Sequence, residues 1–421
     1  MQIKERNVNM CNSTSTTTTT IEDKSNNYCT GCSVCAVICP TKAIEYSLNK
    51  YGFYEAVINK EKCINCGKCK KVCPKYDTKD SISLETGKLY SARTKDETAL
   101  KSCTSGGIAY EIAKYGIKKG YLIFGTIYDY NENIAKAVII EDEKELEALK
   151  GSKYIQSDTK KAVEELIEKC KQNKDNKFII FGTPCQIAGI SKIIKNERIE
   201  NEIIKVDLFC HGVPSYIVWK KYIEELKEKY KIEKIDKCIF RSKHYGWHNF
   251  CIEIKQKNEK ERFISSEKSN FYKIFFDNMF LNFSCYDCEV RKNISYADIR
   301  LGDFWGRKYY NDLKGISAVL IMTDIGRSIL KALDKDIEII EECKLEDCFT
   351  SQSLDKYKNI DFNNKMINIL EEKHSLKTII HTYRRKMSLK QKVKLNLKAC
   401  MGRVSPKCKY NLKKIYYKIK K

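Results

Sequence analysis

The sequence lacks several features that would place it in a familiar class. No apolar run in its 421 residues approaches the roughly 18 residues that a membrane-spanning helix needs. The N-terminus is polar and rich in threonine, without the apolar core of a signal peptide. The chain has no GxGxxG or P-loop phosphate motif and no HExxH zinc motif. We therefore expect neither a membrane span nor a secreted protein.

Acidic residues are absent from the end of the chain. From Ser375 onward there are sixteen Lys or Arg and no Asp or Glu, and without this segment the net charge falls from +23 to +7. The positive charge is therefore a property of a tail, which argues against a nucleic-acid-binding core. One helical face of the tail is apolar, with basic residues beside it: Leu376, Ile379, Ile380, Tyr383 and Met387.

Three interpretations of this tail, residues 375–421, stay open. A basic amphipathic helix is typical of attachment to an anionic membrane surface. RNA or another anionic polymer is an alternative partner. The simplest alternative is a helix that packs on the protein core.

Cysteine is abundant, with 21 residues in a chain that shows no secretion signal. In such a chain cysteines are typical of thiolate metal ligands in a reducing compartment and not of a disulfide framework. We therefore expect a cytoplasmic protein, peripheral at the membrane if the tail binds there.

The same cysteine pattern, C-x2-C-x2-C-x3-C-P, occurs twice between Tyr28 and Pro74. It is the bacterial ferredoxin pattern for two 4Fe-4S cubanes, in which the fourth cysteine of each run ligates the other cluster. A structural zinc site usually shows two CxxC pairs instead. One cluster is predicted on Cys29, Cys32, Cys35 and Cys73, and the second on Cys63, Cys66, Cys69 and Cys39.

Beyond residue 88 strands and amphipathic helices alternate, which predicts an α/β domain with a partly parallel sheet. In such sheets ligands bind at the carboxyl ends of the strands. Strands are predicted over 121–128, 135–140, 178–181, 203–209, 238–240, 250–254 and from 297, and helices over 143–149, 158–170, 186–195, 215–230 and 270–280, with a last strand-helix pair within 316–333.

Four further cysteines lie in predicted turns: Cys185, Cys210, Cys285 and Cys288. The first two follow strand ends and the last two form a CxxC. They could converge on a third iron-sulfur cluster. Alternatively, Cys185 and Cys210 are ordinary buried residues, or Cys185 is a reactive thiolate at a helix N-terminus.

Five ordered motifs make residues 28–350 resemble the coenzyme F420 hydrogenase/dehydrogenase beta-subunit family. They are Ser105-Gly106-Gly107, Gly151-Ser152-Lys153-Tyr154, Gly182-Thr183-Pro184-Cys185-Gln186, Cys210-His211-Gly212-Val213-Pro214-Ser215 and Gly302-Asp303-Phe304-Trp305-Gly306. The resemblance implies an α+β ferredoxin-like dicluster module followed by an α/β flavin-binding core with a mixed, partly parallel sheet. The helical basic tail, which lies outside the resemblance, is expected from its charge and helical pattern. The expected segments are a disordered N-terminus over 1–27, the dicluster domain over 28–80, the two parts of the core over 81–165 and 166–350, and the tail over 351–421.

The resemblance also implies a function. We expect an FAD and 4Fe-4S oxidoreductase that exchanges a hydride with coenzyme F420, a flavin or another conjugated small molecule, and single electrons with a ferredoxin-like partner. The alternative is a non-catalytic ferredoxin-type electron-transfer subunit of a larger redox complex. Family members hold a 4Fe-4S cluster of their own in the core, which favours the four-cysteine site. The flavin is expected at Ser105, Gly106, Gly107, Lys153 and Tyr154, where glycines let backbone amides approach a pyrophosphate.

Two further residues are candidate catalytic groups. His211 follows a strand end and could donate a hydrogen bond to flavin or substrate, although a histidine in a turn is often structural. Asp303 could fix an active-site loop or simply cap its turn.

Overall fold

The structure is a computed structural model that describes residues 20–21, 29–257, 259–306, 308–349, 351–352, 354, 357, 360–389 and 392–393. The predicted disordered N-terminus lies outside the described residues, except for Thr20 and Ile21, which are buried. Within the described ranges no helix has both the length and the apolar character to cross a membrane.

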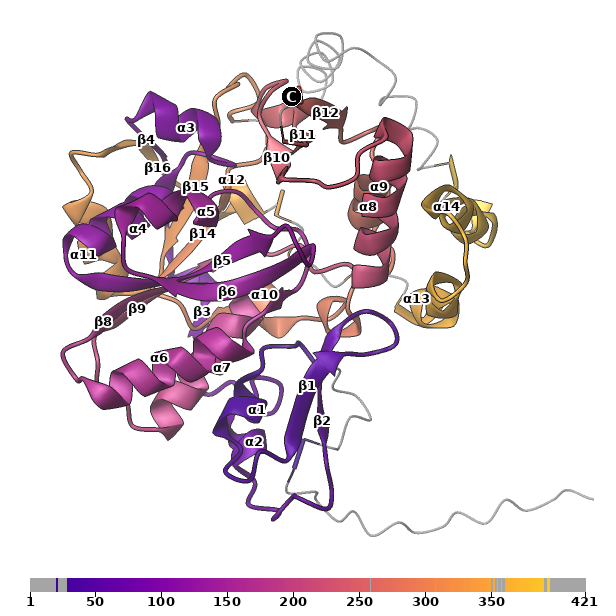
Figure 1. Ribbon diagram of the computed structural model, residues 1–421. Coiled ribbons are helices and arrows are strands. Elements are labelled where there is room, and N and C mark those ends of the chain that lie inside the picture. Colours follow the sequence, from indigo (N-terminus) through magenta and orange to yellow (C-terminus); the bar gives the residue numbers. More distant parts are fainter. Residues whose placement is uncertain are drawn as a thin grey trace, which may run out of the picture.

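The first module contains two short helices and a hairpin (Figure 1). Helices α1 (Val34–Ile38) and α2 (Lys68–Val72) each lie inside one cysteine run, and strands β1 (Ile44–Leu48) and β2 (Tyr54–Ile58) pair antiparallel. Each helix ends at the cysteine before a proline, Cys39 or Cys73, whose backbone is extended. This is the expected effect of proline on the residue before it.

A nine-stranded mixed sheet forms the core, in the order β16-β4-β15-β14-β9-β8-β5-β6-β7. The pairs β5–β8, β8–β9, β9–β14 and β6–β7 are parallel and the other pairs antiparallel, so the predicted mixed sheet is confirmed. The strands are β4 (Lys88–Thr94), β5 (Tyr121–Asp129), β6 (Ile134–Ile140), β7 (Ser157–Asp158), β8 (Lys177–Phe181), β9 (Ile203–Leu208), β14 (Ile299–Asp303), β15 (Ser317–Ile321) and β16 (Ile337–Cys343).

Helices cover both faces of this sheet (Figure 1). Phe178 and Ile180 of β8 pack with α6 and α7 and with the ferredoxin module, whereas Ile179 packs on the other face with α4 and α11. A strand segment covered on both faces is apolar, as β8 is from Phe178 to Phe181. These helices are α3 (Glu97–Ser102), α4 (Ile108–Lys118), α5 (Leu146–Leu149), α6 (Lys160–Gln172), α7 (Pro184–Asn196), α10 (Glu289–Lys292), α11 (Asp324–Ala332) and α12 (Leu345–Phe349). The predicted division at residue 165 falls inside α6, and strands from both sides of it join one sheet.

A third hydrophobic cluster lies beside the core, built on helices α8 and α9. Its small antiparallel sheet contains β10, β11 and β12, and a separate short pair joins β3 to β13. The bounds are α8 (Tyr216–Tyr230), β10 (Lys237–Ser242), β11 (Cys251–Lys255), β12 (Arg262–Ser265), α9 (Asn270–Phe276), β3 (Ile82–Ser83), β13 (Ile294–Ser295), α13 (Ile360–Met366) and α14 (Leu376–Arg385).

Helix α14 shows what the apolar face of the tail does. Leu376, Ile379, Ile380 and Tyr383 are buried against this third cluster, and α14 contacts α8 and α9. The Tyr383 hydroxyl donates to Asn363 Oδ1 at 3.1 Å. This face is therefore occupied by the protein core and leaves α14 no apolar surface for a membrane. Residues 394–421, the rest of the predicted tail, lie outside the described residues.

Candidate functional site

Two small cavities in the ferredoxin module are lined by the two predicted ligand sets. The first, here called the proximal cavity, is lined by Cys29, Cys32, Cys35 and Cys73. The second, the distal cavity, is lined by Cys39, Cys63, Cys66 and Cys69. The fourth cysteine of each run therefore lines the cavity of the other run, which is the crossed arrangement of dicluster ferredoxins.

The proximal cavity lies against the core. A Cβ added to Gly189 in α7 would lie only 3.0 Å from the Cys32 sulfur, so glycine permits this close approach. The Thr159 hydroxyl lies 2.9 Å from Ser33 Oγ and 3.3 Å from the Cys32 carbonyl oxygen. Gln156 accepts from the Tyr54 amide at 2.7 Å. The module therefore packs on α7, which carries Cys185 in its first turn, and is hydrogen-bonded to the segment that precedes α6.

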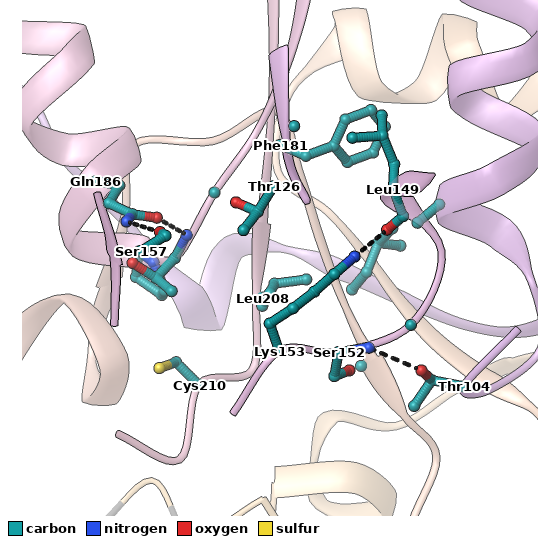
Figure 2. Close-up of a pocket in the computed structure, with 18 of the residues that line it drawn as sticks. Thr104, Thr126, Leu149, Ser152, Lys153, Ser157, Phe181, Gln186, Leu208 and Cys210 are labelled. Atoms are coloured by element: carbon teal, nitrogen blue, oxygen red, sulfur yellow. Dashed lines mark hydrogen bonds between the residues drawn. The ribbon is translucent and has the colours of Figure 1, made fainter. Parts of the chain in front are cut away.

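The candidate site is a cavity of about 300 Å³ at the carboxyl ends of parallel strands β8 and β9. Its volume is at the lower end of the range for small-molecule sites, about 300–1,000 Å³. Figure 2 shows Phe181 and Leu208 from these strand ends, with Cys210 and Lys153 beside them. The lining includes all four of the additional cysteines that the sequence singled out: Cys185, Cys210, Cys285 and Cys288. The chain thus brings turns from distant segments together where the sheet predicts a ligand.

The four thiols of this core cysteine site interact electrostatically. Burial raises the pKa of Cys185 well above its ordinary value, and the thiols of Cys288, Cys210 and Cys285 add to the effect. Burial and neighbouring thiols also raise the pKa of Cys210 to about 11 and of Cys285 to about 12. These shifts disfavour a reactive thiolate at Cys185. Thiolates gathered here would need cations among them, and iron ions would supply that charge.

The sulfurs are not arranged around a single ion. Within the described part of the chain, no three His, Cys, Asp or Glu side chains form a group that could hold one metal ion. The same holds for the eight cysteines of the ferredoxin module, which also form no such group. A cubane, by contrast, binds each of its cysteines at a separate corner.

Ser105 and Gly107 form another part of the cavity wall, whereas the predicted site residue Gly106 between them does not line it. A Cβ on Gly106 would lie 2.5 Å from the Ala92 carbonyl oxygen, and Gly107 has a φ of +83° at the start of α4. Close approach and turn geometry both require glycine here. Gly107 caps α4 without a side-chain hydrogen bond, and its neighbour Ile108 also lines the cavity. The first-turn amides of α4 are suited to an anion.

Two lysines organise the loops around the cavity. Lys153 Nζ donates to the carbonyl oxygens of Ala148, Leu149 and Lys150 at 2.9–3.1 Å, and Figure 2 shows the bond to Leu149. Burial lowers the pKa of Lys153 to about 7. Lys243 donates in the same way to three loop carbonyl groups, and burial lowers its pKa to about 8. Lys153 therefore stabilises the wall of the cavity as well as lining it.

Two predicted site residues point elsewhere. The Tyr154 ring contacts Tyr272 and Phe275, and His211 lies against the same Phe275 and near Tyr357. His211 Nε2 lies 3.3 Å from the Phe275 carbonyl oxygen. Neither side chain lines the cavity, although their sequence neighbours Lys153 and Cys210 do.

Asp303 does line the cavity, and its carboxylate is held on both sides. Trp247 Nε1 donates to Oδ1 at 2.6 Å, and the buried Arg241 guanidinium pairs with Oδ2. Arg241 in turn lies between the rings of Phe250 and Trp305, 4.8 and 4.6 Å from their centroids. Asp303 is therefore a fixed anionic group at the cavity wall.

Sequence reasoning missed several residues of the site. Arg241 and Lys243 are isolated basic residues just after a predicted strand, with no motif around them. Arg291 lines the cavity, is 2% exposed and donates to the Cys285 carbonyl oxygen at 2.7 Å. A charged residue three positions after a CxxC is the only local signal that could have indicated it.

Comparisons with known proteins agree with this organisation. Residues 175–347 match the family model that describes the C terminus of the beta subunit of coenzyme F420 hydrogenase/dehydrogenase. Residues 28–76 and 55–113 match two models described as "4Fe-4S dicluster domain". The two dicluster matches overlap on the second cysteine run. A comparison with curated proteins finds no match.

Among solved structures, one similar chain comes from the xenon-derivatised F420-reducing [NiFe] hydrogenase complex of Methanosarcina barkeri. It is 18% identical, with a TM-score of 0.45, and the match covers 66% of this chain and 89% of that chain. The two kinds of family model cover the segments that contain the ferredoxin cavities and the core cysteine site. This chain therefore combines an N-terminal 4Fe-4S dicluster domain with a segment, residues 175–347, that matches the C-terminal part of the coenzyme F420 hydrogenase/dehydrogenase beta-subunit family.

Proposed function

We propose that this iron-sulfur protein is an FAD-containing oxidoreductase that links a hydride donor or acceptor to a one-electron carrier protein. One observation carries the proposal. A single cavity has the core cysteine site in its wall and the uncapped N-terminus of α4, with Lys150 and Lys153, in the same lining. The first feature suits a 4Fe-4S cluster and the second suits the diphosphate of a dinucleotide.

The residues divide between the cofactors as follows. We assign flavin binding to the Ser105-Gly106-Gly107 turn and to Lys153. The backbone amides that follow the turn and the charged form of the Lys153 side chain would both favour an anion in the cavity. A bound flavin supplies the conversion between two-electron hydride chemistry and single electrons. Asp303, fixed by Arg241 and Trp247, positions the loop that closes the cavity wall. Coenzyme F420 is the proposed hydride partner, because residues 175–347 match the family model of the coenzyme F420 hydrogenase/dehydrogenase beta subunit.

A second candidate is an electron-transfer subunit without a substrate of its own. It is favoured by the position of His211, the one histidine proposed as catalytic, whose ring lies among aromatic residues and outside the cavity lining. In that case the α/β core would serve as a platform for a partner subunit.

Cofactor content separates the two candidates. Protein purified without oxygen is expected to contain about twelve irons, about twelve acid-labile sulfides and one FAD per chain. Iron and sulfide assays and flavin fluorescence after denaturation would measure these. About eight irons without flavin, after reconstitution with excess FAD, would contradict the oxidoreductase and leave the electron-transfer subunit.

Lys153 gives flavin binding an expected pH dependence. Because the pKa of Lys153 is lowered to about 7, the Lys153 amine is mostly neutral at pH 8 in the flavin-free chain. An anion bound nearby favours the charged form and raises that pKa. FAD binding at pH 8 should therefore take up close to one proton, measurable by calorimetric titration of the flavin-free chain in two buffers with different ionisation heats.

The matched variants are Lys153→Met, which should bind FAD more weakly and without proton uptake, and Lys101→Met, an exposed lysine that should behave as the wild type. Equal proton uptake by Lys153→Met and the wild type would remove Lys153 from the flavin site.

A further inference from the structure

The three cysteine sites are arranged in order from the core to the surface. The core site includes Cys185 in the first turn of α7, and the proximal cavity meets the same helix at Gly189, one turn further on. Cys32 in the proximal cavity is 7% exposed. In the distal cavity, by contrast, Cys66 is exposed. The distal cavity is therefore the end of the series that a partner protein can reach.

The surface around the distal cavity has an unusual composition. Ile64, between Cys63 and Cys66, is 63% exposed. A large exposed aliphatic side chain at the edge of a charged surface is typical of an interaction site. The exposed residues of this loop and the adjacent α2 are here called the distal rim: Lys62, Ile64, Asn65, Cys66, Lys68 and Lys71.

The distal rim is positively charged. Between residues 60 and 71 there are five lysines and one acidic residue, Glu61. Many other lysines of this chain form ion pairs, such as Lys192 with Asp77 and Lys195 with Asp80. Among the described residues, the three rim lysines form no ion pair or hydrogen bond through their side chains. Their charge is therefore available to an anionic partner and steers its approach.

We propose that the distal rim is the docking surface for an acidic one-electron carrier protein of the ferredoxin class, with Ile64 at the centre and the three lysines around it. A cluster held by Cys39, Cys63, Cys66 and Cys69 in the distal cavity would exchange one electron with the carrier in each encounter, so that one would be oxidised as the other is reduced. This inference rests on the proposed function in requiring clusters in the ferredoxin module, but it does not depend on flavin.

The test is binding of an acidic dicluster ferredoxin to the full-length, cluster-loaded protein, measured by calorimetry without oxygen and without turnover. Raising NaCl from 50 to 300 mM should weaken binding about tenfold, because surface charges are screened. The triple variant Lys62→Glu, Lys68→Glu, Lys71→Glu should bind about 30-fold more weakly or worse. Ile64→Ser, which removes the apolar side chain without adding charge, should weaken binding about tenfold with little change in salt dependence.

A matched control reverses three exposed lysines elsewhere, Lys118, Lys119 and Lys335, beside α4 and α11 on the far side of the sheet from the ferredoxin module (Figure 1). It should bind like the wild type. Iron content is measured in every variant. Equal weakening in the control and rim variants, or no saturable binding by an iron-replete wild type, would overturn the docking surface. A chain that cannot be loaded with iron would overturn this inference and the proposed function together.

Discussion

Replacing Cys185 by serine is expected to lower the iron content from about twelve to about eight atoms per chain, with an equal loss of sulfide. The physical reason is that the core cysteine site gathers four thiols in one cavity wall, so that loss of one ligand should leave a cluster there incompletely held. The ferredoxin cysteines line separate cavities and should keep their clusters. Iron and sulfide analysis of protein purified without oxygen would measure the change.

A second ligand variant distinguishes loss of a cluster from a local folding defect at α7. Cys288→Ser, at the start of α10, should produce the same loss of about four irons. Cys170→Ser is the matched control, because Cys170 is 2% exposed in α6 but lies in none of the three cysteine sites. Unchanged iron in both ligand variants would show that these cysteines hold no cluster.

Asp207→Asn is expected to cost about 3–5 kcal/mol of stability, the range for removing one partner of a buried ion pair. Asp207 and Arg300 are both fully buried, and the carboxylate accepts two bonds from the guanidinium at 2.7 Å. Arg300 also donates to the Val290 carbonyl oxygen in α10, the helix that follows Cys288. The substitution leaves the Arg300 charge uncompensated and loosens the support of the core cysteine site.

The measurement is the urea midpoint of the α/β core, followed by tryptophan fluorescence under nitrogen. The exposed pair Lys174–Glu200, whose side chains are 83% and 76% exposed, supplies the control. Lys174→Ala should change stability by less than about 1 kcal/mol. If Asp207→Asn shifted the midpoint no more than this control, the buried pair would not be a structural support of the site.

The sequence alone determined the parts of the protein whose signals are local. The ferredoxin ligands follow from spacing within one loop, because three sulfurs separated by two residues can reach one cubane. The strand-turn-helix repeats indicated the partly parallel sheet, since a segment covered on both faces, such as residues 178–181 of β8, is apolar. Strands β4, β12 and β16, by contrast, carry no comparable signal and were not predicted.

Tertiary structure alone decided which residues meet and which way they face. Cys185 and Cys288 are brought to one cavity wall from turns about a hundred residues apart, which no local spacing encodes. Lys153 lines the cavity and Tyr154 does not, because adjacent side chains leave the backbone in different directions. The apolar face of α14 fits a membrane or a protein core equally well by pattern, since both exclude water. Only the fold shows that α8 and α9 already cover it.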